Sequence, residues 1–207
     1  MVDLRELGAL QLDALREVAN IGAGHAATAL SQMTQRRIWV NAPRIHVVRV
    51  EDVGELTGRS DEVIAAVAMQ MLGDLAGRTI QVFPGDTARR LAGILLNRED
   101  ITFPDGFGEL EQSALKEAGN ILGAAYLNAL SDFLGLLLLT SVPALAIDLA
   151  AAVLTSGSVG VLAESDHLIC IDTIFRMGDE PEGLQGHFFL IPDPDSLQVI
   201  LRSIRLA

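Results

Sequence analysis

Two pairs of a carboxylate and a carboxamide stand 100 residues apart in the chain. Glu17 precedes Asn20 by three residues, and Glu117 precedes Asn120 by the same spacing. Side chains three residues apart lie on one face of a helix, so each pair combines an acceptor-only carboxylate with an amide that both donates and accepts hydrogen bonds. The solvated face of an ordinary amphipathic helix explains a lone pair of this kind. The duplication instead favours a function shared by both copies, without assigning a reaction to it.

The repeat extends well beyond these pairs. Each copy reads Asp or Ser, three residues, Glu, two residues, Asn, 22 residues and Pro; the copies are Asp13, Glu17, Asn20, Pro43 and Ser113, Glu117, Asn120, Pro143. Charge and turn signals gather between the copies, from Asn97 to Gly106. We expect a single domain, 1–207, made of pseudo-repeats 1–100 and 101–207 and arranged like a dimer fused into one chain.

The repeated segment has the pattern of a long helix. Residues from about Leu10 to Met33 and from about Glu109 to Asp132 contain no proline and show helical periodicity. The motif residues fall on one face of each helix, where Gly24 or Ala124, one turn beyond the Asn, leaves room for another surface. The opposite face of the first helix should pack on the protein body, through Leu15, Val18, Gly22, Ala26, Ala29 and Leu30.

The remaining segments predict strands and shorter helices. Strands are expected at 37–40, 44–50, 63–72 and 79–83, and then at 138–147, 168–175 and 188–191. A capped helix should run from 86 to about 96, and a closing helix from 195 to about 204. The predicted class is α+β, with two pseudo-symmetric halves and two long helices packed on a largely antiparallel β-sheet.

Composition excludes several classes of function. The chain has 15 basic and 27 acidic side chains, a net charge of −12, and no basic cluster, so nucleic acid is not an expected partner. The apolar stretch 133–154 contains Pro143 and Asp148, so we expect a buried core element there and no membrane insertion. The N-terminus, Met1 to Glu6, lacks the pattern of a signal peptide.

The single cysteine, Cys170, lies in an apolar run typical of a buried strand and cannot form an internal disulfide. A cytoplasmic location fits this thiol. The four histidines show no ligand spacing with Cys170, so we expect no metal or cofactor of the protein's own; they are His25, His46, His167 and His187.

The doubled motif resembles the CheC/CheX/FliY family of chemotaxis phosphatases, whose signature it matches at every position in both copies. The run from Asn20 to Gly24 is also similar to the family. Two copies are typical of the CheC branch, whereas CheX carries one, and the additional flagellar-switch domain of FliY is not expected here. The resemblance covers essentially the whole chain.

The resemblance implies hydrolysis of the aspartyl phosphate on a CheY-type response regulator. It implies that Glu17 and Glu117 contact the regulator at its active-site lysine, and that Asn20 and Asn120 orient the attacking water. An acyl phosphate is labile and the regulator brings its own divalent metal, Mg²⁺, so positioning and charge stabilisation are the main needs.

The other motif positions are expected to be structural. Asp13 and Ser113 should cap or steady the first helical turn, and Pro43 and Pro143 should shape a strand.

The resemblance also implies CheD, a receptor-modifying deamidase, as a partner. Its contact surface does not follow from the sequence; Asp148 is a candidate, for which a helix N-cap is the alternative. The competing function is a non-catalytic adaptor that sequesters the phosphorylated regulator or CheD. The two complete motifs favour catalysis, because an adaptor does not need a water-positioning Asn on each face.

Overall fold

A computed structural model of the chain describes residues 8–49, 52–57, 61–98, 106–155, 167–177 and 183–204. Within these ranges the elements follow in the same order twice. The first series is α1 (Ala9–Thr34), β1 (Ile38–Val40), β2 (Arg44–Arg49), α2 (Val53–Leu56), β3 (Val63–Gly73), β4 (Gly77–Pro84) and α3 (Gly85–Leu95). The second is α4 (Glu109–Leu134), β5 (Leu138–Thr140), β6 (Ala144–Leu149), α5 (Ala150–Thr155), β7 (His167–Met177), β8 (Leu184–Pro192) and α6 (Pro194–Ile204).

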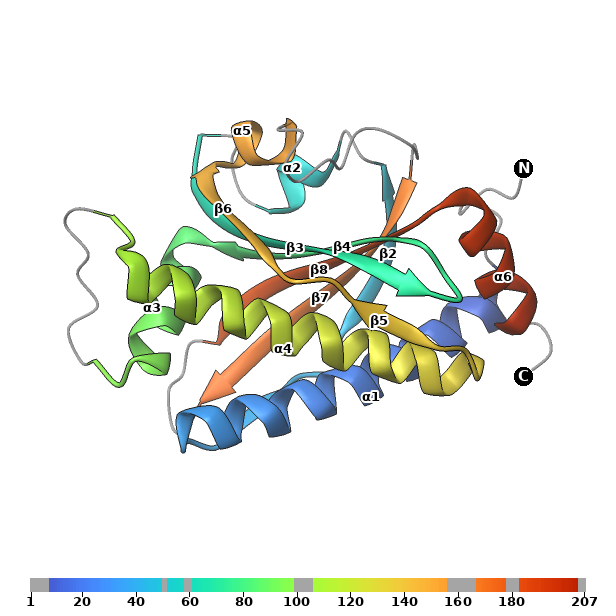
Figure 1. The fold of residues 1–207 in the computed structure, drawn as a ribbon, viewed down its shortest axis with the longest axis horizontal. Coiled ribbons are helices and arrows are strands. Elements are labelled where there is room, and N and C mark those ends of the chain that lie inside the picture. The colour runs from blue at the N-terminus through green and yellow to red at the C-terminus, as the bar shows by residue number, and fades with distance from the viewer. Residues whose placement is uncertain are drawn as a thin grey trace.

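The strands of both series form one eight-stranded sheet in the described ranges. Its order is β1-β7-β8-β4-β3-β5, with β2 also paired to β7 and β6 to β3 (Figure 1). All of these pairings are antiparallel. One edge of the sheet is formed by β1 and β2 of the first series, which pair with β7 of the second. The other edge is formed by β5 and β6 of the second series, which pair with β3 of the first. Neither half completes its own part of the sheet without the other.

The two long helices, α1 and α4, lie side by side on one face of the sheet and run in opposite directions (Figure 1). Their buried faces pack on apolar strand residues that include Phe83, Phe175 and Phe188. The short helices α2 and α5 cover part of the other face, where Val53 and Val153 pack on a second apolar cluster. The predicted α+β class, with two long helices on an antiparallel sheet, is confirmed.

The apolar stretch 133–154 differs from the prediction. It forms the end of α4, the edge strands β5 and β6 and the beginning of α5, with the predicted single strand interrupted before Pro143. Leu139 is half exposed and Val142 is 88 % exposed, so the stretch as a whole is not a buried core element. An edge strand is covered on fewer sides than a central one, which is why apolar composition misled here. None of the described helices is long and apolar enough to cross a membrane.

Two further differences concern short elements. The sequence did not predict α2 or α5, because helices of four and six residues carry too little periodicity to be recognised. Residues 99–105 of the predicted junction and the N-terminal segment Met1 to Glu6 lie outside the described residues. The division of the chain at residue 100 stays a prediction.

Around Pro43, the edge strand contains one residue more than the matching part of β7, with which it pairs. Val40 pairs with Phe175 and Arg44 with Asp172, so four steps along the edge match three steps along β7. Such an extra residue is a β-bulge, and proline suits it because it has no N–H to give to the ladder. The second half repeats the shift before Ala144, as the pairs Thr140–Met71 and Ala144–Ala68 show.

The two long helices approach each other tightly at Gly22 of α1. A Cβ on Gly22 would lie 2.6 Å from Cδ1 of Tyr126 and 3.0 Å from its Cα, on α4. Gly22 belongs to the stripe predicted to pack on the protein body, most of which is buried. Gly24, two residues along the same helix, is exposed and has no neighbouring heavy atom within 4 Å of its Cβ position.

We expect Gly22→Ala to destabilise the protein by about 1–3 kcal/mol, because the methyl group forces α1 away from α4. Urea unfolding followed by circular dichroism measures the change. Gly24→Ala is the matched control, since it gains about the same 0.5–1 kcal/mol of helix propensity without a clash. Equal stability of the two variants would contradict the close helix contact.

Candidate functional site

The first motif lies on the solvent side of α1. Asp13, Glu17 and Asn20 are exposed, whereas Leu15 and Val18 between them are buried. The motif face predicted from the helical period is therefore open to a partner.

The second motif is presented in the same way by α4. Ser113 and Glu117 are exposed and Asn120 is half-buried, while Leu115 and Ala118 face the core. The two motif faces belong to the two helices that lie against each other, so both are part of the same helix layer of the molecule.

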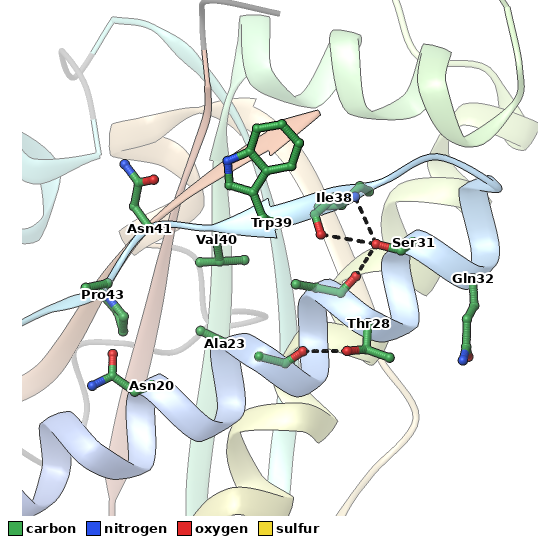
Figure 2. A pocket seen from close by; sticks show the side chains of 13 residues that line it. Asn20, Ala23, Thr28, Ser31, Gln32, Ile38, Trp39, Val40, Asn41 and Pro43 are labelled. Carbon is green, nitrogen blue, oxygen red and sulfur yellow. Dashed lines mark hydrogen bonds between the residues drawn. The ribbon is translucent and has the colours of Figure 1, made fainter. Parts of the chain in front are cut away.

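An open groove of about 600 Å³ lies between α1 and the segment Ile38–Pro43. Asn20 and Pro43 both line it, on facing walls (Figure 2). The 22 residues between them in the motif correspond to the rest of α1 and the return of the chain through β1. Glu17 lies one turn before Asn20, outside the lining residues. The structure thus brings Asn20 and Pro43 together and keeps Glu17 at the end of the groove.

Ser31 fastens the strand wall of the groove to the helix. Its Oγ accepts the N–H of Ile38 at 2.9 Å and lies 2.6 Å from the carbonyl oxygen of Ala27, to which it donates (Figure 2). In the second half, Ser131 Oγ donates to the carbonyl oxygen of Leu136. The sequence did not reveal that Ser31 and Ser131 hold the segment that follows each long helix.

Other groove residues were not predicted. Trp39 and Asn41 line the strand side, and Gln32 lies at the far end of the helix side (Figure 2). Trp39, the only tryptophan of the chain, is 40 % exposed. The signal that could have found these residues is their position in the segment that leads to Pro43, since the motif fixes that segment opposite Asn20.

The predicted capping role of Asp13 and Ser113 is wrong. The N-caps are Gly8 and Gly108, so both residues lie beyond the first helical turn. Asp13 instead forms an exposed ion pair with Arg16, at 2.6 Å. The helix begins at Ala9, close to the predicted start but four residues before Asp13, and the N–H of Gly8 donates to the side-chain oxygen of Gln11.

A separate group of reactive side chains lies on the other face of the sheet. Burial raises the pKa of Cys170 far above its usual range, and the neighbouring carboxylate of Asp172 raises it further. Burial alone would also raise the pKa of Asp172, but its hydrogen bond to His187 and the charge of that histidine lower the pKa overall, with smaller effects of Cys170 and His46. Spacing along the chain gave no sign that these residues meet, because they come from three strands.

The comparisons with known proteins bear on the motif faces. The CheC-like family matches residues 10–47 and 110–147, two ranges that contain the two motif copies. The CheY-P phosphatase CheC of Bacillus subtilis (strain 168) is 36% identical over 190 residues, which are 91% of this chain and 90% of that protein.

Solved structures share the fold. FliY of Thermotoga maritima superposes with a TM-score of 0.78 over 97% of this chain and 98% of that chain, at 18% identity. CheX of Borrelia burgdorferi, solved in a complex with CheY, beryllium fluoride and magnesium, gives a TM-score of 0.51 at 17% identity, over 83% of this chain and 96% of that chain.

Proposed function

The chain belongs to the CheC-like family, and on this premise we propose that it is a phosphatase that hydrolyses the aspartyl phosphate of a CheY-type response regulator. The observation that carries the proposal is the doubled Glu–Asn pair on the exposed faces of α1 and α4. A reducing cytoplasm, where the free thiol of Cys170 stays reduced, is the compartment we propose for it.

In the reaction, water attacks phosphorus in line with the bond between phosphorus and the aspartyl oxygen. That bond breaks, the regulator's carboxylate is the leaving group, and inorganic phosphate is released. A carboxamide can accept a hydrogen bond from this water and donate one to a phosphoryl oxygen, so Asn20 or Asn120 fixes the water without acting as a base. The Mg²⁺ that we expect the regulator to hold would neutralise charge on the phosphoryl oxygens.

The glutamate directs the docking. Glu17 lies one helical turn before Asn20, and side chains at this spacing have Cβ atoms about 5–6 Å apart. An ion pair between Glu17 and a lysine beside the phosphorylation site then leaves Asn20 next to the phosphoryl group. Gly24 projects no side chain, so the regulator's surface can approach the helix beyond Asn20. Glu117, Asn120 and Ala124 have the same spacing on α4, with the small side chain of Ala124 in place of Gly24.

We expect the double variant Asn20→Ala/Asn120→Ala to lose the protein-dependent rate by about 100-fold, because the water is no longer held in line. The assay phosphorylates a CheY-type regulator with a small-molecule donor, removes the donor and follows the loss of phosphate. Each single variant reports the share of one face.

Gln185→Ala serves as the control, since it removes an exposed carboxamide from a strand outside the motif faces. If wild-type protein fails to accelerate the loss of phosphate, the phosphatase function is wrong. If the double Asn variant remains as fast as wild type, the water-positioning role is wrong.

The glutamates should behave differently from the asparagines. We expect Glu17→Ala/Glu117→Ala to raise KM for the phosphorylated regulator at least about tenfold with a smaller change in kcat, because a docking ion pair is lost. Steady-state kinetics with varied regulator concentration separates the two constants. A loss confined to kcat would show that the glutamates act on the chemical step.

We further propose that CheD binds at the edge formed by β5 and β6. Asp148 is exposed on β6, and the exposed apolar side chains of Leu139, Val142 and Leu149 lie on the same two strands or between them. An uncovered strand edge with exposed apolar side chains is a typical protein-binding surface. The N-cap alternative for Asp148 finds no support, because its Oδ1 accepts the N–H of Leu149, which precedes α5.

We expect Asp148→Lys to weaken the binding of purified CheD by at least about tenfold, since an exposed charge near the end of the edge is reversed. Isothermal titration calorimetry measures the affinity. Asp132→Lys on α4 also reverses an exposed carboxylate and should bind CheD as wild type does. Equal affinities of all three proteins would move the CheD contact to another surface.

A further inference from the structure

Four side chains from three strands meet on the sheet face opposite to α1 and α4. His46 comes from β2, Cys170 and Asp172 from β7, and His187 from β8. His46 is paired with Cys170 across one ladder, and Asp172 is paired with His187 across the next. Directly paired residues of antiparallel strands point to the same face, as do residues two apart on one strand, so all four side chains gather there.

The carboxylate of Asp172 lies at the centre of the group. Its Oδ1 is 2.7 Å from His187 Nδ1 and 3.3 Å from Cys170 Sγ, and its Oδ2 is 3.0 Å from His46 Nε2. One ligand atom each of Cys170, Asp172 and His187 can be chosen so that all three lie within 4.8 Å of one another. Around a tetrahedral zinc ion with bonds of about 2.0–2.3 Å, ligand atoms stand roughly 3.3–3.8 Å apart. The distance from Asp172 Oδ1 to Cys170 Sγ already lies in this range, and the distance from Oδ1 to His187 Nδ1 is shorter.

The internal symmetry of the chain shows that the fold does not require these polar residues. In the other half, the ladder pair that corresponds to His46 and Cys170 is Ala146 and Ala66. The pair that corresponds to Asp172 and His187 is Ala68 and Ile80, on β3 and β4. The same positions are thus filled by apolar side chains in one half and by four side chains that can bind metals in the other.

Burial and access also fit an ion. Cys170 and His187 are buried, at 0 % and 3 % exposed, and Phe189 stacks beside His187 as an apolar wall. The side chain of Asp172 is 24 % exposed and that of His46 is 45 % exposed, so the group opens to solvent on the side of β2. Burying a polar or charged group is costly unless it is hydrogen-bonded or paired with an opposite charge. A bound cation would supply that charge for the thiolate of Cys170 and the carboxylate of Asp172.

We propose that Cys170, Asp172 and His187 bind a zinc ion, and that His46 holds the free oxygen of the Asp172 carboxylate as an outer-sphere partner. A donor set of sulfur, nitrogen and oxygen suits zinc, whereas magnesium and calcium take oxygen ligands. On binding, the thiol proton of Cys170 leaves to solvent, and His187 keeps its proton on Nε2 so that Nδ1 is free to coordinate. The fourth position faces the open side and takes a water molecule.

The ion would connect the two halves of the chain. β2 belongs to the first series of elements and β7 and β8 to the second, and the carboxylate that binds zinc is the one that His46 of β2 holds. A ligand that binds only the folded state stabilises it, so zinc should raise the melting temperature.

The test uses tag-free protein stripped with a chelator and then titrated with zinc or cobalt(II). We expect one zinc per chain by calorimetry, a higher Tm with zinc, and a thiolate-to-cobalt charge-transfer band in the near ultraviolet. Cys170→Ser should abolish this band, and Asp172→Asn, which keeps the shape of the side chain but removes its charge, should also weaken zinc binding. His46→Ala should weaken it by about 10- to 100-fold.

His25→Ala, which removes an exposed histidine of α1, is the control and should bind zinc as wild type does. The proposal is overturned if wild-type protein binds no zinc, if its cobalt form lacks the thiolate band, or if Cys170→Ser and Asp172→Asn both keep wild-type affinity. Circular dichroism of each variant shows that a loss of binding is not a loss of the fold.

Discussion

The exchange of edge strands between the two halves is the constraint on which the rest of the structure depends. β1 and β2 form their ladder with β7, and β5 and β6 form theirs with β3, so each half supplies the edge of the other. Backbone groups of β3 and β7 would otherwise stay unpaired at the rim of a sheet that is buried on the helix side. This arrangement also fixes α1 and α4, because each helix leads directly into one of the exchanged strands. Arg98 and Glu111 add a partly buried ion pair across the junction of the two halves.

The groove beside Asn20 follows from this constraint. After α1 the chain must return along β7, and Ser31 holds the first residues of that return against the helix. The extra residue near Pro43 then bends the edge strand, so that the segment before it forms the second wall. The net charge of −12 gives no general attraction toward an acidic phosphorylation pocket. Recognition of a regulator therefore depends on the local face, where one carboxylate can meet a lysine and one carboxamide can meet water.

Local sequence patterns were sufficient to predict the long helices and the central strands. The helical spacing of Leu15, Val18 and Gly22 predicted the buried face of α1, and two strand-like runs on either side of a turn with glycine at both ends predicted β3 and β4. The exchange of edges could not be predicted, because an apolar strand looks the same whichever partner it pairs with. For the same reason Leu139 and Val142 were expected in the core, although they lie on an edge.

The candidate sites show the same division. Glu17 and Asn20 were predicted because they lie on one helix, whereas His46, Cys170 and His187 become neighbours only through two ladders. Duplication explains why one molecule can carry both kinds of site. Two copies of the motif occupy the helix layer, where either can face a regulator, and the outer sheet face is free to differ between halves as long as the ladder positions stay filled. Ala66 and Ala68 fill them with small apolar groups under α5, while Cys170 and Asp172 leave a polar group that opens beside β2. The sheet separates this polar group from the motif faces of α1 and α4. A structural change at the polar group can therefore reach the motif helices only through the strands between them.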